Sequence, residues 1–351
     1  MFAGYLANSL LKNPRLYSTI GQIMSQHCKT VTCETVAEAA ELLKKGNLVA
    51  FPTETVYGLG ADARNPESVA RIFESKQRPS FDPLIVHASD VNQAKKLVTE
   101  FSKMAERLAE RFWPGPLTLV LPRNSQIPDL VTSGLAGVGI RIPEHSMALQ
   151  LLETADCPVA APSANPFGGI SPTTAQHVRD GLEGRIDGIL DGGPCKVGVE
   201  STVLSLMTSQ PTILRPGGTP IEDIESVIGP VLQAKSDPQK DDSAQPAPGM
   251  LSRHYAPSTP LTIIARGTKA IPIAGKQTGL LTYGPETGVE DRFDHVRSLS
   301  PDENLRTCAA NLFAAMRGLD SANLDVIIAH DFPDFGLGLA LNDRLHRAAT
   351  L

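Results

Sequence analysis

Apolar residues recur along the chain in short runs separated by polar segments, a pattern that predicts alternating helices and strands. Thr35 and Glu38 form a capping box, apolar residues at helical spacing follow, and Gly46 suits the end of that helix. Pro66 suits the first turn of another helix, which we expect to run to about Lys76. Short buried strands are expected at 48–51, 84–87, 117–121, 139–142, 159–161, 201–206 and 213–214, and further helices near 91–98, 102–112, 146–154 and 173–180.

The last hundred residues alternate in the same way. Strands are predicted at 261–265, 280–283 and 325–329, with helices at 302–317 and 338–349. Both parts are therefore expected to be α/β, although periodicity does not tell whether the first sheet is parallel or mixed. Between them, residues 233–249 contain Pro, Ala, Ser, Gln and charged residues, a composition typical of a linker.

Composition narrows the range of functions. The chain has 351 residues, of which 20% are charged and 41% hydrophobic, so we expect a globular protein of two domains. Its formal net charge of −6 argues against binding of nucleic acid by bulk electrostatics, so direct tRNA binding should be weak or absent. No apolar run approaches the roughly 18 residues of a membrane-spanning helix, and we expect no membrane partner.

The cysteines and the N-terminus bear on the cellular compartment. The five cysteines are widely spaced and form no C-x-x-C, which disfavours a disulfide framework or a cysteine zinc site and favours the cytoplasm. Residues 1–33 contain no Asp or Glu but several basic and hydroxyl residues. This segment is either an organellar targeting peptide or an extension upstream of a second start at Met24.

Several common motifs are excluded. Residues 58–63 fit G-x-G-x-x-A, but the helix that a dinucleotide site requires begins only near Pro66. The chain has no G-x-x-x-x-G-K-[ST], H-E-x-x-H or G-x-S-x-G motif. Its eight histidines lack metal-ligand spacing, so we expect no protein-bound metal.

Four polar clusters remain, at strand ends or loops, where α/β proteins place ligand sites. They are 52–60, 75–87, 137–143 and 160–171. Lys76 and Arg78 are either a two-cation clamp for a polyphosphate or cations that complement a helix dipole. Arg141, inside an apolar strand, needs either a structural ion pair or a substrate carboxylate.

Together these clusters predict a crevice rich in hydroxyls and cations within an acidic protein. Such a crevice suits a small, strongly anionic ligand such as a nucleotide. No nucleophile–base pair is evident, so catalysis would rest on positioning and charge stabilisation.

Seven segments in this order closely resemble the threonylcarbamoyl-AMP synthase family with its YrdC-like domain: PTETVYGLG (52–60), SKQRPSFDPLIVH (75–87), RFWPGPLTLVL (111–121), GIRIP (139–143), APSAN (161–165), ESTV (200–203) and ILRPGG (213–218). PGMLSRHYAP (248–257) resembles the linker of the family's long form, and GLGLALNDRLHRAA (336–349) the end of its C-terminal domain. The resemblance implies a YrdC-like twisted open sheet with flanking helices and a smaller Rossmann-like α/β domain. The expected division is an extension at 1–33, a catalytic domain at 34–230, a linker at 231–259 and a C-terminal domain at 260–351.

The resemblance also implies a reaction. L-Threonine, bicarbonate or CO2, and ATP with Mg2+ would give threonylcarbamoyl-AMP, pyrophosphate and water, making the enzyme a nucleotidyltransferase. The product would pass to the tRNA threonylcarbamoyl transferase machinery, which modifies the adenosine at position 37 of tRNA.

Site residues follow from the matching motifs. The expected catalytic residues are Lys76, Arg78, Ser163 and Asn165. The expected threonine-side residues are Thr55, His87, Arg141, Ala161 and Ser201. The expected nucleotide-side residues are Arg78, Asp82, Gly137, Ser163, Ser171, Arg215 and Tyr255. The linker residues Arg253, His254 and Tyr255 are expected to close over bound ATP.

Two departures and three alternatives stay open at this point. The family usually has Asn where this chain has Asp82, and often Thr or Ser at Gly137, so ATP affinity could be lowered. The linker motif also differs at 251–252. The alternatives are a non-catalytic binder of nucleotide or double-stranded RNA, a carbamoyl transferase using carbamoyl phosphate, and a regulatory paralogue without turnover.

Overall fold

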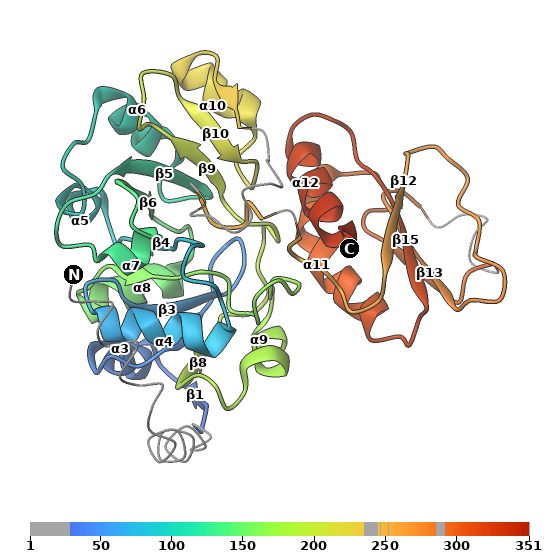
Figure 1. Ribbon diagram of the computed structural model, residues 1–351, viewed down its shortest axis with the longest axis horizontal. Helices are drawn as coiled ribbons and strands as arrows, with labels where there is room; N and C mark the ends of the chain where they lie inside the picture. The colour runs from blue at the N-terminus through green and yellow to red at the C-terminus, as the bar shows by residue number, and fades with distance from the viewer. Residues whose placement is uncertain (1–28, 235–244, 246, 252, 286–291, 351) are drawn as a thin grey trace, which may run out of the picture.

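The computed structural model describes residues 29–234, 245, 247–251, 253–285 and 292–350, which form two α/β units (Figure 1). Residues 1–28 of the predicted extension and 235–244 of the predicted linker lie outside the described residues. Both units have the α/β character that the sequence predicts.

The first unit is built on an eleven-stranded mixed sheet, counted over the described residues, in the order β1-β8-β2-β3-β7-β4-β6-β5-β9-β10-β11. Its strands are β1 (Val31–Cys33), β2 (Val49–Phe51), β3 (Gly58–Asp62), β4 (Ile85–His87), β5 (Leu117–Pro122), β6 (Gly137–Arg141), β7 (Val159–Ala160), β8 (Gly188–Leu190), β9 (Thr202–Ser205), β10 (Thr212–Arg215) and β11 (Leu232–Gln233). Parallel and antiparallel neighbours alternate irregularly, which answers the question that periodicity left open.

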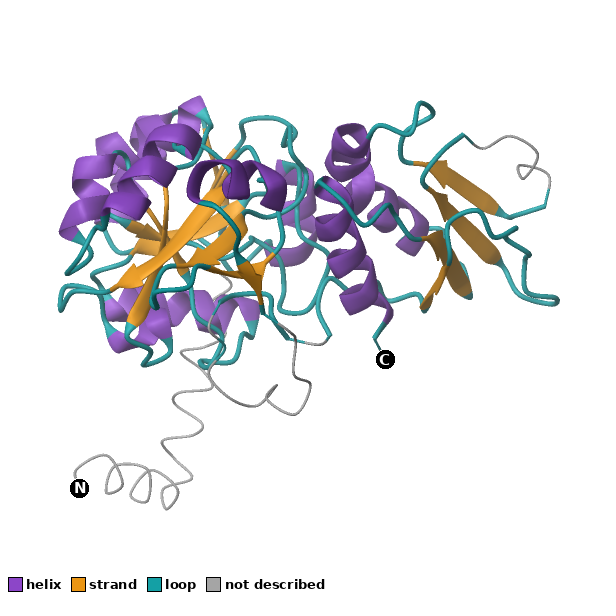
Figure 2. Cartoon of the chain, turned by 90° about the horizontal axis from the view of Figure 1, so that it is seen from above, coloured by secondary structure: helices purple, strands orange, loops and turns teal. Residues whose placement is uncertain are grey.

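Helices cover both faces of this sheet (Figure 2). They are α3 (Val36–Lys44), α4 (Pro66–Lys76), α5 (Val91–Lys96), α6 (Lys103–Phe112), α7 (Asp129–Thr132), α8 (Ser146–Ala155), α9 (Ala175–Leu182) and α10 (Ile221–Ile228). One buried cluster joins Leu43 of α3 and Leu151 of α8 to Phe51. Another joins Ile72 of α4 and Leu108 of α6 to the central strands. The apolar stripe of each helix therefore meets the sheet.

The second unit has a four-stranded parallel sheet in the order β12-β15-β13-β14, with all pairs within the described residues parallel. Its elements are β12 (Leu261–Ile264), β13 (Thr278–Thr282), β14 (His295–Ser298), α11 (Leu305–Asp320), β15 (Val326–His330) and α12 (Leu337–Ala349). Helices α11 and α12 lie on the side of this sheet that faces the first unit (Figure 1).

The two units share a continuous hydrophobic core. Val56 and Val199 of the first unit belong to the same buried cluster as Leu312 and Phe313 of α11. At Gly198 the backbones approach so closely that a Cβ atom would lie 2.2 Å from the carbonyl oxygen of Ala309. Packing of this kind fixes the position of α11 and α12 relative to the first unit.

The predicted elements agree with the structure to within a few residues, and the differences have physical reasons. β1 pairs with β8, so the first sheet begins inside the segment expected to be an extension. The G-x-G-x-x-A segment is strand β3, not a phosphate loop. A Cβ atom on Gly60 would lie 2.8 Å from Val159 and 2.9 Å from Phe51, so this glycine serves sheet packing. Among the described residues, no helix has the length and apolar character needed to cross a membrane.

We predict that Gly198→Ala destabilises the protein more than Gly134→Ala. Both glycines have positive φ, +77° and +79°, but a Cβ at Gly134 has nothing within 4 Å. Gly134→Ala should cost only the backbone strain, about 1–2 kcal/mol. Gly198→Ala adds a collision with the α11 backbone and should cost clearly more than that. Urea unfolding of both variants measures the difference, and equal losses would contradict the close approach of the two units.

Candidate active site

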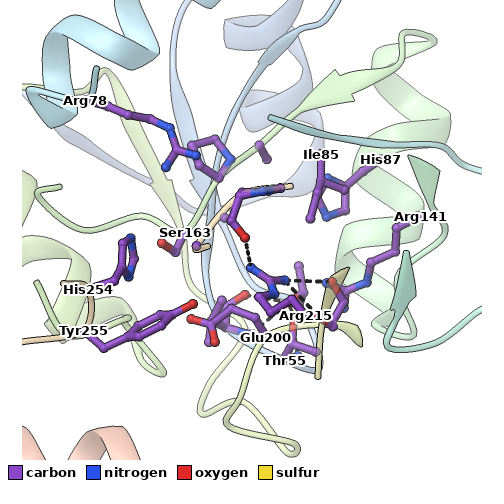
Figure 3. Close-up of a pocket in the computed structure, with 18 residues that line it drawn as sticks. Thr55, Arg78, Ile85, His87, Arg141, Ser163, Glu200, Arg215, His254 and Tyr255 are labelled. Atoms are coloured by element: carbon purple, nitrogen blue, oxygen red, sulfur yellow. Dashed lines mark hydrogen bonds between the residues drawn. The ribbon is translucent and has the colours of Figure 1, made fainter. Parts of the chain in front are cut away.

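A pocket of about 520 Å³, including its open mouth, lies where several strands of the first sheet end. Its lining residues are Thr53, Thr55, Val56, Gly58, Arg78, Ile85, His87, Arg141, Ala161, Pro162, Ser163, Glu200, Ser201, Arg215, Pro248, Gly249, His254 and Tyr255 (Figure 3).

Strand register brings the central residues together. β4 and β6 are parallel neighbours, and His87 lies opposite Arg141 at their carboxyl ends. β7 runs antiparallel to β4, and the backbone N–H of Ala161 donates to the Ile85 carbonyl at 2.9 Å. Segments that are far apart in the sequence therefore present His87, Arg141 and Ala161 to one space.

Each of two pocket arginines has a buried carboxylate partner. Arg141 pairs with Glu54 at 2.7 Å, and Arg78 pairs with Asp82 at 2.9 Å. The structural ion pair, one of the two alternatives considered for Arg141, is therefore present, and because Arg141 also lines the pocket, its binding of a substrate carboxylate stays a prediction. Pairing lowers the large cost of burying each charge.

Asp82 does not line the pocket, although it was expected on the nucleotide side. Its side chain is completely buried and faces Arg78. Burial raises the pKa of Asp82, and the charge of Arg78 opposes that rise. The carboxylate therefore acts on the pocket through Arg78, whose charge it partly balances.

Arg215 is anchored differently, through backbone oxygens. It donates to the carbonyls of Ser201 and Pro248, both at 2.9 Å, and the second bond ties the linker segment to the pocket. The hydroxyl of Ser201 lies 2.8 Å from that of Thr118. Arg215 makes no ion pair with a carboxylate at any position the structure describes.

Lys76 and Asn165 lie behind the pocket wall and do not line it. The Lys76 ammonium donates to the carbonyl oxygens of Ser163, at 2.6 Å, and of Asn165. The Asn165 amide donates to the carbonyls of Pro166 and Gly169. Burial and the charge of Arg78 lower the pKa of Lys76. In this structure both residues shape the loop that presents Ser163.

Two other expected nucleotide-side residues also lie outside the lining. Gly137 borders a neighbouring cavity, where a Cβ atom would come within 2.8 Å of Val120, so a Thr or Ser there would require repacking. Ser171 is buried and donates its hydroxyl to Glu200 at 2.5 Å. Glu200 itself lines the pocket.

The linker residues His254 and Tyr255 cover one side of the pocket. His254 and Tyr255 are buried in the lining, with their ring centroids 4.1 Å apart. Arg253 is exposed and lies outside the lining, so its closure over bound ATP stays a prediction. Gly249 has φ +74°, and a Cβ there would lie 2.6 Å from the Tyr255 hydroxyl.

Sequence reasoning missed two buried side chains at the site. Thr118 supports the Ser201 hydroxyl, and Arg344 of α12 pairs with Glu200 at 2.7 Å. The only signal for Arg344 was its place in the segment resembling the C-terminal domain. No spacing rule predicts that this segment reaches the pocket.

No group of three or more His, Cys, Asp or Glu side chains that could hold a metal ion is found in the described part of the chain. The carboxylates nearest the pocket, Glu54, Asp82 and Glu200, are each paired with an arginine.

We predict that His87 contributes to acid sensitivity. Burial, followed by the charge of Arg141, lowers the pKa of His87 to about 3, from 6.5 in the unfolded chain. Between these values the unfolded chain binds a proton that the folded chain does not. The stability that neutral, buried His87 contributes to the folded protein is therefore fully present above pH 6.5 and is lost as the pH falls toward 3.

His87→Gln should flatten the dependence of the unfolding free energy on pH between 6 and 4 by about 1.4 kcal/mol per pH unit. Exposed His346 provides the control, and His346→Gln should leave the slope unchanged. Urea unfolding at a series of pH values gives both slopes, and equal slopes for the His87 variant and the parent protein would disprove the assignment.

Comparison with known proteins agrees with this architecture. A family described as "Telomere recombination" (Sua5, YciO and YrdC) matches residues 41–217, and "Threonylcarbamoyl-AMP synthase, C-terminal domain" matches residues 219–350.

The threonylcarbamoyl-AMP synthase of Bacillus subtilis is 46% identical over 90% of this chain and 92% of that protein. The Pyrococcus abyssi enzyme is 44% identical over 89% of this chain and 93% of that protein. The crystal structure of P. abyssi Sua5 complexed with L-threonine superposes with a TM-score of 0.81 at 43% identity, covering 90% of this chain and 94% of that one. The chain therefore belongs to the threonylcarbamoyl-AMP synthase family, in its two-domain form.

Proposed function

We propose that this protein is an L-threonylcarbamoyladenylate synthase, a nucleotidyltransferase that makes threonylcarbamoyl-AMP and pyrophosphate from L-threonine, bicarbonate or CO2, and ATP. The observation that carries the proposal is the charge pattern of one pocket. A charge-balanced end holds the buried Arg141–Glu54 pair. The other, cationic end holds Arg78, which is paired with Asp82, and Arg215, which has no carboxylate ion-pair partner in the described ranges. Two relatives named threonylcarbamoyl-AMP synthase, at 44% and 46% identity over most of the chain, support it.

The balanced end suits a zwitterionic amino acid. Arg141 and Glu54 form a buried pair of opposite charges, and Thr55, His87 and Ser201 surround Arg141 in the same space. Arg141 would bind the threonine carboxylate, since guanidinium groups match carboxylates geometrically. The structure of P. abyssi Sua5 complexed with L-threonine shows that a relative binds this amino acid.

The cationic end suits the nucleotide. Arg78 and Arg215 enter the pocket from opposite sides (Figure 3), and Ser163 belongs to the same lining. Arg78 would hold the triphosphate with Ser163, while Arg215 and Tyr255 would lie toward the nucleoside. Lys76 and Asn165 would position the Ser163 loop through the bonds described above.

The chemistry needs no protein nucleophile. The neutral threonine amine either adds to CO2 and releases a proton, or condenses with bicarbonate and releases water, and both routes give the same carbamate. A carbamate oxygen then attacks the α-phosphorus, a P–O bond forms, and the bond to pyrophosphate breaks. The pocket would align the two reactants and stabilise charge on the leaving pyrophosphate.

Mg2+ would enter with ATP and neutralise part of the triphosphate charge. The described residues fit that role, because they offer oxygen ligands such as the Ser163 hydroxyl but no three-carboxylate cage. Apart from Mg2+, the positive charges that would face the triphosphate belong to Arg78 and Arg215.

The product would pass to the machinery that forms threonylcarbamoyladenosine at position 37 of tRNA. We place the reaction in the cytoplasm, a reducing compartment, since the four cysteines that the structure describes are buried and unpaired.

The decisive assay measures pyrophosphate release from purified protein with ATP, Mg2+ and bicarbonate, with and without L-threonine. We expect release that depends on both threonine and bicarbonate, together with a threonylcarbamoyl-AMP mass. Threonine-independent release, or ATP binding without release, would contradict the proposal.

Asp82→Asn should tighten ATP binding several-fold. The change keeps the size of the side chain and removes the charge that balances Arg78, so more of the Arg78 charge acts on the triphosphate. Calorimetric titration with ATP measures the dissociation constant. Asp62→Asn is the control, because Asp62 pairs with Arg64 outside the pocket. Weaker ATP binding in Asp82→Asn would show that Asp82 supports the site instead of weakening it.

A further inference from the structure

Arg344, from the last helix of the second unit, is a fully buried arginine beside the pocket of the first unit. Its side chain has 0% exposure and is the largest of the fully buried side chains. Its Nε donates to Oε2 of Glu200 at 2.7 Å, across the boundary between the two units.

Glu200 faces the pocket but is held from two sides. One oxygen accepts from Arg344, and the other accepts from the Ser171 hydroxyl at 2.5 Å. Burial alone would raise the pKa of Glu200, but the charges of Arg344 and Arg215 outweigh burial and lower it. Glu200 is therefore a fixed negative charge in the lining of a pocket that we expect to take a polyanion.

Arg344 also supports the aromatic cover of the pocket. Its guanidinium carbon lies 5.1 Å from the centre of the Tyr255 ring, and that ring also stacks on Phe313, with 5.6 Å between the ring centroids. Tyr255 adopts a positive φ of 62°, so its backbone conformation depends on such surrounding contacts.

The neighbouring charges on α12 complete a balanced group. Asp343 pairs with Arg344 and with Arg347, whose Nε lies 2.9 Å from Asp343. Arg347 also donates to the carbonyls of Met250 and Leu251 in the segment that covers the pocket. Arg344 and Arg347 together with the carboxylates of Glu200 and Asp343 therefore carry no net charge.

We propose that Arg344 is a positioning residue of the active site, which cancels the charge of Glu200 and fixes Glu200 and Tyr255 at the nucleotide end of the pocket. The proposal rests on the proposed function, since its consequence is stated for ATP. It makes the C-terminal unit part of the nucleotide site: without Arg344, an uncompensated Glu200 would repel the triphosphate.

The test compares ATP and L-threonine binding, by calorimetry on the full chain, in the parent protein, Arg344→Gln, Arg344→Lys and the double variant Arg344→Gln/Glu200→Gln. Breaking a buried charge pair is costly, so Arg344→Gln should weaken ATP binding at least about tenfold. Threonine binding should change less than about twofold, because the Arg141 end is untouched. Arg344→Lys should recover most of the ATP affinity by restoring the charge.

The double variant separates charge from packing. It removes one positive and one negative charge together, so it should bind ATP more tightly than Arg344→Gln alone. A merely structural role predicts the reverse, since two buried side chains are altered. Exposed His346, on the same helix, provides the control variant His346→Gln, which should bind both ligands like the parent protein.

Three results would overturn the inference: unchanged ATP binding in Arg344→Gln, equal losses for ATP and threonine, or a double variant no better than Arg344→Gln. These results are distinct from failure of the proposed function. A parent protein that binds ATP but releases no threonine-dependent pyrophosphate would contradict the reaction and leave the binding comparison intact. A parent protein that does not bind ATP would refute both.

Discussion

Burial of paired charge is the constraint on which the site depends. Arg78, Arg141 and Arg344 are all buried near one pocket, and each has a carboxylate within 2.9 Å. A buried charge without a partner costs several kcal/mol, so each carboxylate lowers the free-energy cost of placing these cations together. An arginine that is paired with one carboxylate still has donors for other partners, because its planar guanidinium group carries five N–H donors. The same guanidinium can therefore hold an internal carboxylate and still present donors to a substrate.

The sheet brings these side chains to one place, and small residues allow the close packing of strands that this arrangement requires. Glycines in β3 let Phe51 and Val159 pack against the strand, and the central strands end side by side at the pocket. The second unit contributes in the same way from outside. Close packing at Gly198 fixes α11, and α12 then carries Arg344 to within hydrogen-bond distance of Glu200. The C-terminal unit thus supports Glu200 and Tyr255 from behind the pocket, although none of its own described residues belongs to the lining.

Local signals in the sequence predicted most of the longer helices and many of the strands, while most of the expected site residues followed from the family resemblance. The capping residues and apolar spacing of α3 and α4 predict both helices, and Thr35 and Asn65 do cap them. Strand ends followed by polar residues located His87 and Arg141 together. What local patterns could not provide was the pairing of charges. Arg344 and Glu200 are 144 residues apart, and no periodicity relates them. Short strands such as β8 and β14 were missed for a similar reason, since their stability comes from their neighbours in the sheet.

The charge of the pocket differs from one part to another. Around Arg141, the ion pair with Glu54 leaves no net charge, which would match an amino acid that carries one charge of each sign. Arg78 is paired with Asp82, whereas Arg215 is bound to backbone carbonyls and has no carboxylate ion-pair partner in the described ranges. Arg215 therefore leaves surplus positive charge where the proposed function puts the nucleotide, although the protein as a whole carries a formal charge of −6. Because Arg215 is buried and held by oriented carbonyl dipoles, it acts on an anion more strongly than an exposed lysine would. The net negative charge of the chain and a local affinity for a polyanion are thus compatible. The net charge acts over long distances through solvent, where salt screens it, whereas the pocket acts on a ligand at contact distance.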